Sequence, residues 1–217
     1  MYNITLICSF HAEIGNCNPV ELFKIIETIK PEIIFEEIPY DRFDKYYKYK
    51  SAYTLETDAI NMYLENYIIQ HIPVDTYEFS DAIQEKMNFL YNNISENNPE
   101  YIKLLKEQYI MTIQNGFLFL NSDRFNNIIE DIHNIEKNTL KLLNNNELFS
   151  IHNKWMEITN NRENEILNNI YKYSKRNEYN NAMLIIGAEH GKSILSKAKE
   201  YNIKKDLEIN WMSWRIA

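Results

Sequence analysis

The sequence has little of what usually marks a specialised class of protein. It contains 217 residues but only four glycines, five prolines and two cysteines. Two thiols, Cys8 and Cys17, provide neither a disulfide framework nor a four-ligand zinc pattern. No glycine- or serine-rich stretch divides the chain, and its 45% apolar content is enough for one core. We therefore expect a single domain over residues 1–217.

Basic charge and long apolar runs are also scarce. The chain has 23 Lys and Arg against 31 Asp and Glu, a net charge of -8, and its lysines are scattered. This excludes the basic stripe that nucleic-acid binding needs, so we expect no nucleic-acid partner. No window approaches the roughly 18 apolar residues of a membrane span, and the N-terminus does not resemble a signal peptide. We expect a cytoplasmic protein without a membrane partner.

The first third of the chain has the rhythm of an α/β protein. Short apolar runs of strand length alternate with segments whose apolar residues recur every three or four positions. Asn18 followed by Pro19 is a typical helix start, and Pro31 follows the end of that helix. The predicted elements are strands over residues 3–10, 32–38 and 73–79 and helices over residues 19–30 and 55–70.

Only helical patterns follow between residues 80 and 180. They cover residues 81–92, 99–118, 121–143 and 147–176, after which a strand (182–187), a helix (191–201) and a last strand (207–212) restore the α/β rhythm. The sequence therefore predicts an α/β fold with a mostly parallel central sheet flanked by helices. A large helical insertion, about 80–180, separates the third strand from the fourth.

Three polar residues follow or end predicted strands. His11 comes after the first strand, Glu37 ends the second, and His190 follows the fourth. The carboxyl ends of parallel strands meet at one edge, where ligands bind in open α/β sheets. Two imidazoles and a carboxylate there could hold a divalent ion, or supply a general base and its orienting partner. A histidine at a strand end can also be a hydrogen-bonded structural residue, and that alternative stays open.

Other histidines and one glutamate fit this edge less well. His71 is assigned to a helix C-terminus, whereas His133 and His152 fall beside the apolar stripes of their helices. Glu36 and Glu37 are neighbours in a strand and so point to opposite faces, which means that only one can serve the edge.

Arg162 interrupts an apolar stripe in the insertion. It stands between Ile158 and Ile166 at helical spacing, where the side chain should point inward. A buried arginine needs a carboxylate or a bound anion, such as a phosphate or carboxyl group of a substrate. The alternative is a side chain whose end reaches solvent at the edge of the bundle.

The segments "ICSFHAE", "KPEIIFEEIPYDR", "NNRENEI" and "IIGAEHG" together resemble the TraB/Tiki/GumN/ChaN group, which is distantly related to erythromycin-esterase-like proteins. Position by position, His11, Glu37, Arg42, Arg162 and the Gly187–His190 pair match the motifs of that group in order and spacing. The sequence departs from them at Cys8, which replaces a glycine, and at Glu163, which separates Arg162 from Asn164.

The resemblance implies an α/β sheet with inserted helices and a hydrolase of the TraB/Tiki type that cleaves a peptide or ester bond. His11, Glu37, His190 and Arg162 would be catalytic, Arg42 and Arg162 would bind substrate, and His11, His190 and Glu37 would hold a divalent metal ion. The expected partner is a small-molecule or peptide substrate. The alternatives are a ChaN-like protein that binds haem or another small ligand, and a catalytically inactive interaction protein whose tail "WMSWRIA" contacts another copy in a homo-oligomer.

Overall fold

Five parallel strands form the centre of the molecule. The structure is a computed structural model that describes residues 2–76 and 80–215. The strands are β1 (Tyr2–Ser9), β2 (Ile33–Pro39), β3 (Gln70–Asp75), β4 (Asn181–Gly187) and β5 (Ile209–Ser213). Their order in the sheet is β3-β2-β4-β1-β5, and every pairing is parallel. The predicted α/β class with a parallel sheet is confirmed.

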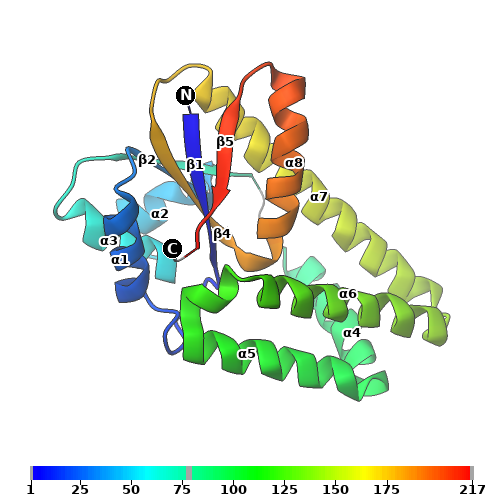
Figure 1. The fold of residues 1–217 in the computed structure, drawn as a ribbon. Helices are drawn as coiled ribbons and strands as arrows, with labels where there is room; N and C mark the ends of the chain where they lie inside the picture. The colour runs from blue at the N-terminus through cyan, green and yellow to red at the C-terminus, as the bar shows by residue number, and fades with distance from the viewer. Residues whose placement is uncertain (1, 77–79, 216–217) are drawn as a thin grey trace.

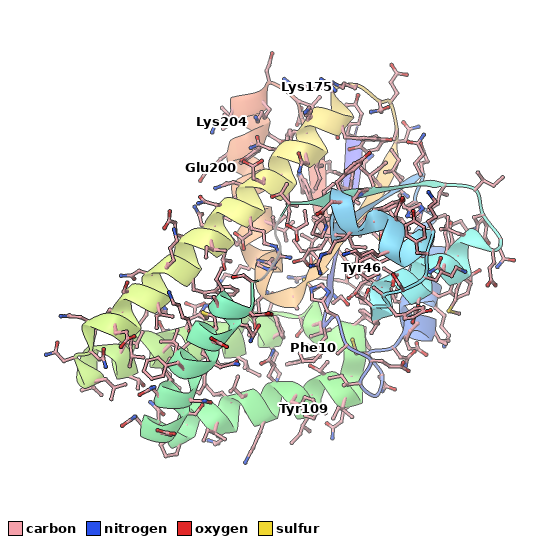
Figure 2. The ribbon with its side chains drawn as sticks, turned by 180° about the vertical axis from the view of Figure 1, so that it is seen from behind. Phe10, Tyr46, Tyr109, Lys175, Glu200 and Lys204 are labelled. Atoms are coloured by element: carbon pink, nitrogen blue, oxygen red, sulfur yellow. The ribbon has the colours of Figure 1, made fainter. Side chains whose placement is uncertain are left out.

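Helices cover both faces of this sheet, as its strands require, because most of their residues are apolar and buried. One face carries α1 (Pro19–Ile29), α2 (Phe43–Tyr47) and α3 (Leu55–Leu64), with the 3-10 helix η1 (Tyr40–Arg42) leading into α2 (Figure 1). The other face carries α8 (Ala188–Lys205) and the C-terminal half of α7 (Asn146–Ser174). Seen from behind, α7 ends near Lys175 and runs beside α8, on which Glu200 and Lys204 are labelled (Figure 2).

The predicted helical insertion lies beyond the carboxyl edge of the sheet (Figure 1). It consists of α4 (Asp81–Asn97), α5 (Pro99–Leu120), α6 (Asp123–Leu143) and the first half of α7. Each of these helices begins after a serine or asparagine whose side chain accepts backbone N–H bonds from the first turn: Ser80, Asn98, Ser122 and Asn145. Such caps satisfy donors that the helix itself leaves unpaired. The insertion is thus divided into helices by local chemistry.

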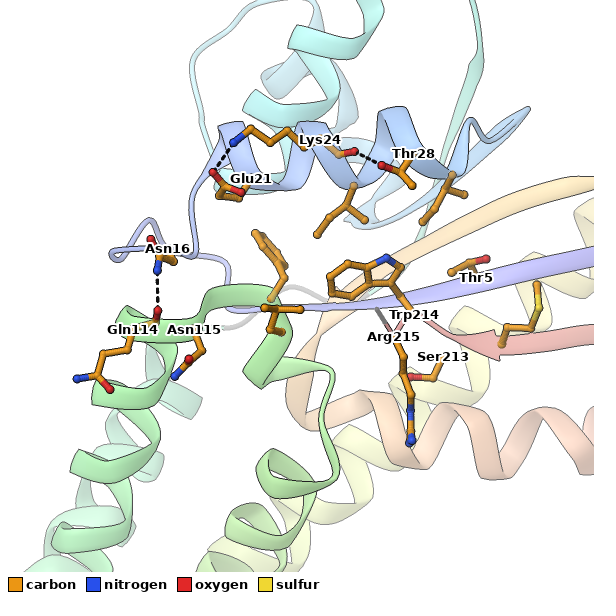
Figure 3. Close-up of a pocket in the computed structure, with 15 residues that line it drawn as sticks. Thr5, Asn16, Glu21, Lys24, Thr28, Gln114, Asn115, Ser213, Trp214 and Arg215 are labelled. Atoms are coloured by element: carbon orange, nitrogen blue, oxygen red, sulfur yellow. Dashed lines mark hydrogen bonds and ion pairs between the residues drawn. The ribbon is translucent and has the colours of Figure 1, made fainter. Parts of the chain in front are cut away.

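Two sets of contacts attach the insertion to the end of β1 and to the loop that follows it. Asn121 at the end of α5 accepts a bond from the Cys8 backbone N–H at 2.8 Å and donates to the Cys8 carbonyl at 3.1 Å. Farther along the loop, the Asn16 N–H donates to the Ile113 carbonyl, and the Asn16 side chain donates to the Gln114 carbonyl at 2.6 Å (Figure 3). The loop that carries His11 is therefore fixed by α5.

Glycine is required at this junction. Gly15 and Gly116 both have positive φ, +53° and +51°. A Cβ at Gly15 would clash with the Ile113 backbone, and one at Gly116 would clash with the Asn16 backbone. Only glycine offers both the left-handed conformation and the close approach without strain.

Several predicted boundaries differ from the observed ones. The third strand was expected over residues 73–79, but β3 begins at Gln70, and residues 77–79 lie outside the described part of the chain. The assignment of His71 to a helix C-terminus is wrong, because α3 already ends at Leu64 and His71 lies in β3. His152 is buried, although it was expected beside the apolar stripe of its helix. Within the described residues, no helix has the length and apolar character needed to cross a membrane.

Candidate functional site

Glu37 is the centre of a buried polar network at the carboxyl edge of the sheet. Its side chain is 3% exposed. One oxygen, Oε2, accepts the Gly187 backbone N–H at 2.5 Å and lies 3.1 Å from His11 Nε2. The other, Oε1, pairs with Arg162 Nη2 and lies 3.7 Å from His190 Nε2. The structure thus gathers four predicted site residues around one carboxylate.

His11 bridges two carboxylates. Its Nε2 faces Glu37, and its Nδ1 lies 3.1 Å from Glu56 Oε1, a residue of α3. The same Glu56 oxygen accepts bonds from the Ser9 hydroxyl and from the His11 backbone N–H. His11 has a φ of +62°, a left-handed conformation that is costly for a residue other than glycine. These contacts hold the ring in place although the side chain is 45% exposed.

His190 lies in the first turn of α8 and is held in a similar way. Its Nδ1 is 2.8 Å from Glu163 Oε1 on α7, while Glu163 Oε2 accepts bonds from Ser193 at 2.6 Å and Lys197 at 2.7 Å. Its Nε2 faces Arg162 Nη1 at 3.5 Å. A guanidinium only donates hydrogen bonds, so Nε2 is the acceptor in this contact, and the ring proton on Nδ1 faces Glu163.

Arg162 joins the two carboxylates that end neighbouring strands. Its Nε lies 3.1 and 3.0 Å from the two oxygens of Asp75, the last residue of β3, and its Nη2 lies 2.7 Å from Asp75 Oδ2. The same Nη2 pairs with Glu37 at the end of β2. With its side chain 12% exposed, Arg162 is buried and paired with carboxylates, which is the first of the two alternatives predicted for it.

The contacts of this network shift the pKa values of Glu37 and His11 in opposite directions. Burial alone would raise the pKa of Glu37, but the hydrogen bond and charge of His11 and the charge of Arg162 lower it to about 2. Burial would lower the pKa of His11, but hydrogen bonds and charges from Glu37 and Glu56 raise it to about 10. Near neutral pH, His11 is an imidazolium beside ionised Glu37.

Two further glycines permit the close packing at this edge. A Cβ at Gly187 would lie 2.7 Å from His11 Nε2, and one at Gly191 would clash with Cys8 Sγ. Cys8 occupies the position where the TraB-like motif has a glycine. The absence of a side chain at Gly191 leaves the space that the Cys8 thiol occupies.

A cavity of ≈ 600 Å³ opens beside the network. It lies between α6, α7 and the start of α8, and both Arg162 and His190 line it. Trp155, Met156 and Phe125 supply apolar walls, while Lys192 and Lys197 supply charge at the rim. A pocket of this size, with a few polar groups at its base, suits a small molecule or part of a peptide.

Glu36 and Arg42 lie outside the central contacts. As predicted, Glu36 points to the opposite face from Glu37, where it accepts bonds from Tyr47 of α2 and lies 2.7 Å from His71 Nδ1. Arg42 ends η1 and is half-buried, whereas the arginine that pairs with Glu37 is Arg162.

The predicted metal ligands do not fit a divalent ion in this arrangement. Both oxygens of Glu37 already accept hydrogen bonds, and the Arg162 guanidinium lies against Glu37 and His190 where a shared cation would bind. Within the described ranges, no three His, Cys, Asp or Glu side chains form a group that could hold a metal ion. The divalent ion remains a prediction that would require Arg162 to move away.

Three carboxylates of the network were not identified as site residues from the sequence. Glu56 was not assigned a role, Asp75 was part of an ordinary strand pattern, and Glu163 counted as a departure from the TraB-like motif. Glu163 directly follows Arg162, and helix neighbours point about 100° apart, so it reaches His190 while Arg162 reaches Glu37. One indication of these carboxylates was present in the sequence. A buried arginine needs carboxylate partners, and Arg162 was expected to point inward.

Another buried carboxylate lies outside this network: Glu136 on α6 is 7% exposed and accepts a bond from the Tyr101 hydroxyl at 3.2 Å. Burial raises its pKa from 4.5 to about 7, and the nearby charge of Glu189 adds to this shift. The folded protein therefore binds the proton more tightly than the unfolded chain does. Its contribution to stability is complete below pH 4.5 and is lost as the pH rises to about 7.

We predict that Glu136→Gln makes the protein more stable than wild type at pH 8, by up to about 3 kcal/mol, and changes little at pH 4.5. Urea denaturation of both proteins across this range measures the difference. Parallel stability curves for the two proteins would contradict the raised pKa of Glu136.

Comparison with protein-family models, with curated proteins and with solved structures gave no match. The resemblance to the TraB/Tiki/GumN/ChaN group therefore remains a prediction from the four sequence segments, and the function is argued from the site itself.

Proposed function

We propose that the protein is a hydrolase that cleaves an ester or peptide bond with His190 as general base. The observation that supports this proposal is that the two histidines make the same kinds of contact. Each ring has its Nδ1 on a buried carboxylate, Glu163 or Glu56, and its Nε2 directed at the Glu37–Arg162 pair. This arrangement fixes the tautomer and orientation that proton transfer requires.

The two histidines have different environments and so different roles. His190 Nε2 removes a proton from a water molecule in the ≈ 600 Å³ cavity, and the resulting hydroxide adds to the substrate carbonyl carbon. Glu163 stabilises the imidazolium that forms. His190 then donates this proton as the carbonyl–heteroatom bond breaks, so the leaving group departs protonated and the ring returns to its starting state. His11, which holds its proton near neutral pH, keeps Glu37 ionised beside Arg162. Arg162 and Glu37 position the two rings.

A substrate screen tests this proposal. Wild type should hydrolyse at least one member of a panel of esters and peptides, and His190→Ala should lose that activity while keeping its melting temperature. His133→Ala is a matched control, because His133 lines the same cavity on α6 but does not contact the Glu37 network. Equal rates for wild type and His190→Ala would refute the role of His190.

The same preparation distinguishes the other hypotheses. Metal analysis, with and without a chelator, tests the divalent ion, whose binding would couple activity to metal content. Haem titration tests the ChaN-like alternative, for which a Soret shift abolished by His190→Ala would be the expected result.

A further inference from the structure

The charged side chains that line the cavity beside His190 fall into two groups. In the part of the chain that the structure describes, most of them are already ion-paired: Arg162 with Glu37, Lys192 with Glu130 at 3.0 Å, and Lys197 with Glu163 at 2.7 Å. Over the same residues, Glu189 and Lys137 line the cavity without an ion-pair partner. These two side chains, one acidic and one basic, are therefore free to bind charged groups of a ligand.

Glu189 and Lys137 belong to different walls of the cavity, and their charges act on the same histidine. Glu189 is in the first turn of α8, directly before His190, and Lys137 is about one helical turn beyond His133 on α6. Burial lowers the pKa of His133, the negative charge of Glu189 raises it, and the positive charge of Lys137 lowers it. Both charges therefore act at the same part of the cavity.

The cavity also has apolar walls and room for a short peptide. Trp155 and Met156 line it from α7, and Met156 is 43% exposed. Lining residues of α6 extend from Phe125 to Lys137, so this helix follows the cavity for about 18 Å. An extended tripeptide spans about 10 Å, which fits within this length and within the cavity volume of ≈ 600 Å³.

We propose that the substrate of this hydrolase is a short peptide with free ends, whose N-terminal ammonium binds Glu189 and whose C-terminal carboxylate binds Lys137. The inference rests on the proposed function, in which His190 is the general base. Because Glu189 directly precedes His190, it holds the ammonium next to the base and brings the first peptide bond to the activated water. Hydrolysis of that bond by one water molecule releases the first amino acid and a peptide shortened by one residue.

The signs of the two charges favour a peptide over other ligands. An ammonium and a carboxylate at the two ends of one molecule match Glu189 and Lys137. A ligand with charge of a single sign would be attracted by one of these side chains and repelled by the other. A long polypeptide chain, whose ends lie far apart, cannot contact both side chains at once, so the arrangement selects short peptides.

A panel of three peptides tests the proposal: trileucine, N-acetyl-trileucine and trileucine amide. Wild type should cleave trileucine with the lowest KM. Blocking either end should raise KM about 10-fold or more, because it removes one charge-assisted contact.

Two variants assign these contacts to residues. Glu189→Gln should raise KM for trileucine about 10-fold without changing KM for the acetylated peptide, and Lys137→Met should raise it similarly without changing KM for the amide. Both side chains are exposed, so neither substitution should disturb the fold. Glu200→Gln is the matched control, because it removes an exposed charge of α8 outside the cavity and should behave as wild type.

Binding can be measured separately from catalysis by calorimetric titration of the three peptides into His190→Ala, which should bind the blocked peptides about 10-fold more weakly than trileucine. If the blocked peptides bind and are cleaved as well as trileucine, or if trileucine does not bind, recognition by Glu189 and Lys137 is refuted, whether or not the protein hydrolyses other substrates. If trileucine binds with the expected preferences but wild type cleaves no member of the panel, the ligand class is supported and the hydrolase is not.

Discussion

Replacing Arg162 with methionine should lower the free energy of unfolding by about 3–5 kcal/mol at pH 7. The side chains of Glu37 and Asp75 are 3% and 1% exposed, and both are ion-paired with this guanidinium. Methionine fills much of the same volume, but it leaves the two buried carboxylates without the positive charge of Arg162. Urea denaturation followed by circular dichroism measures the loss.

The cause of this loss can be separated from packing. A triple variant, Arg162→Met with Glu37→Gln and Asp75→Asn, removes the two carboxylates together with the guanidinium and should recover most of the lost stability. The loss of stability in Arg162→Met should also depend on pH. In wild type, the pKa of Glu37 is about 2, so its stabilisation is present above pH 4.5 and is lost as the pH falls toward 2.

Without Arg162, Glu37 loses one of the charges that lower its pKa, so the folded variant binds the Glu37 proton more tightly than folded wild type does. Its deficit relative to wild type should therefore shrink as the pH is lowered toward 2. A deficit that is independent of pH and is not rescued in the triple variant would show that Arg162 acts through packing alone.

The largest effect on catalysis is expected for His190→Gln, which should lower kcat about 10²–10⁴-fold on whichever substrate the screen identifies. Glutamine keeps a polar group near Arg162 but cannot accept the proton of water. Glu163→Gln should give a smaller loss in the same direction, because it leaves the ring in place without its charged partner. Steady-state kinetics on the three proteins measure the order of these effects.

The two histidines should differ in their dependence on pH. His11 has a pKa of about 10, so wild-type activity should fall at alkaline pH as this proton is lost. His11→Asn should lower kcat and remove that alkaline limb, whereas Glu163→Gln should retain it. An alkaline limb that persists in His11→Asn would assign this titration to another group.

The sequence was sufficient for the α/β class with a parallel sheet, for the helical insertion, and for the edge where the site lies. His11, Glu37 and His190 each follow or end an apolar run, and parallel strands bring their carboxyl ends to one edge. The start of β3 was missed because Gln70 and His71 break the apolar pattern. The first residues of β3 pair with β2, and in the folded sheet His71 lies beside Glu36.

The partners of the histidines could not be predicted from local pattern. Glu56 reaches His11 from α3 and Glu163 reaches His190 from α7, across sequence separations of 45 and 27 residues. A glutamate on an amphipathic helix looks the same in sequence whether it faces solvent or a histidine. Only the packing of α3 and α7 against opposite faces of the sheet determines that these two point toward its edge.

The paired glutamates of β2 also bear on how the chain folds. The strand is apolar on both faces, "IIFEEIP", so its pattern alone does not prevent a shift of one residue against β4. Such a slip would exchange Glu36 and Glu37 between the faces. In the shifted alignment, Glu36 would face Arg162, and Glu37 would face Tyr47 and His71. The shifted state would then be compact, would expose little apolar surface, and would compete with the native state. The Gly187 N–H at the end of β4 bonds to Glu37 in the native alignment, so this bond favours that alignment over the shifted one.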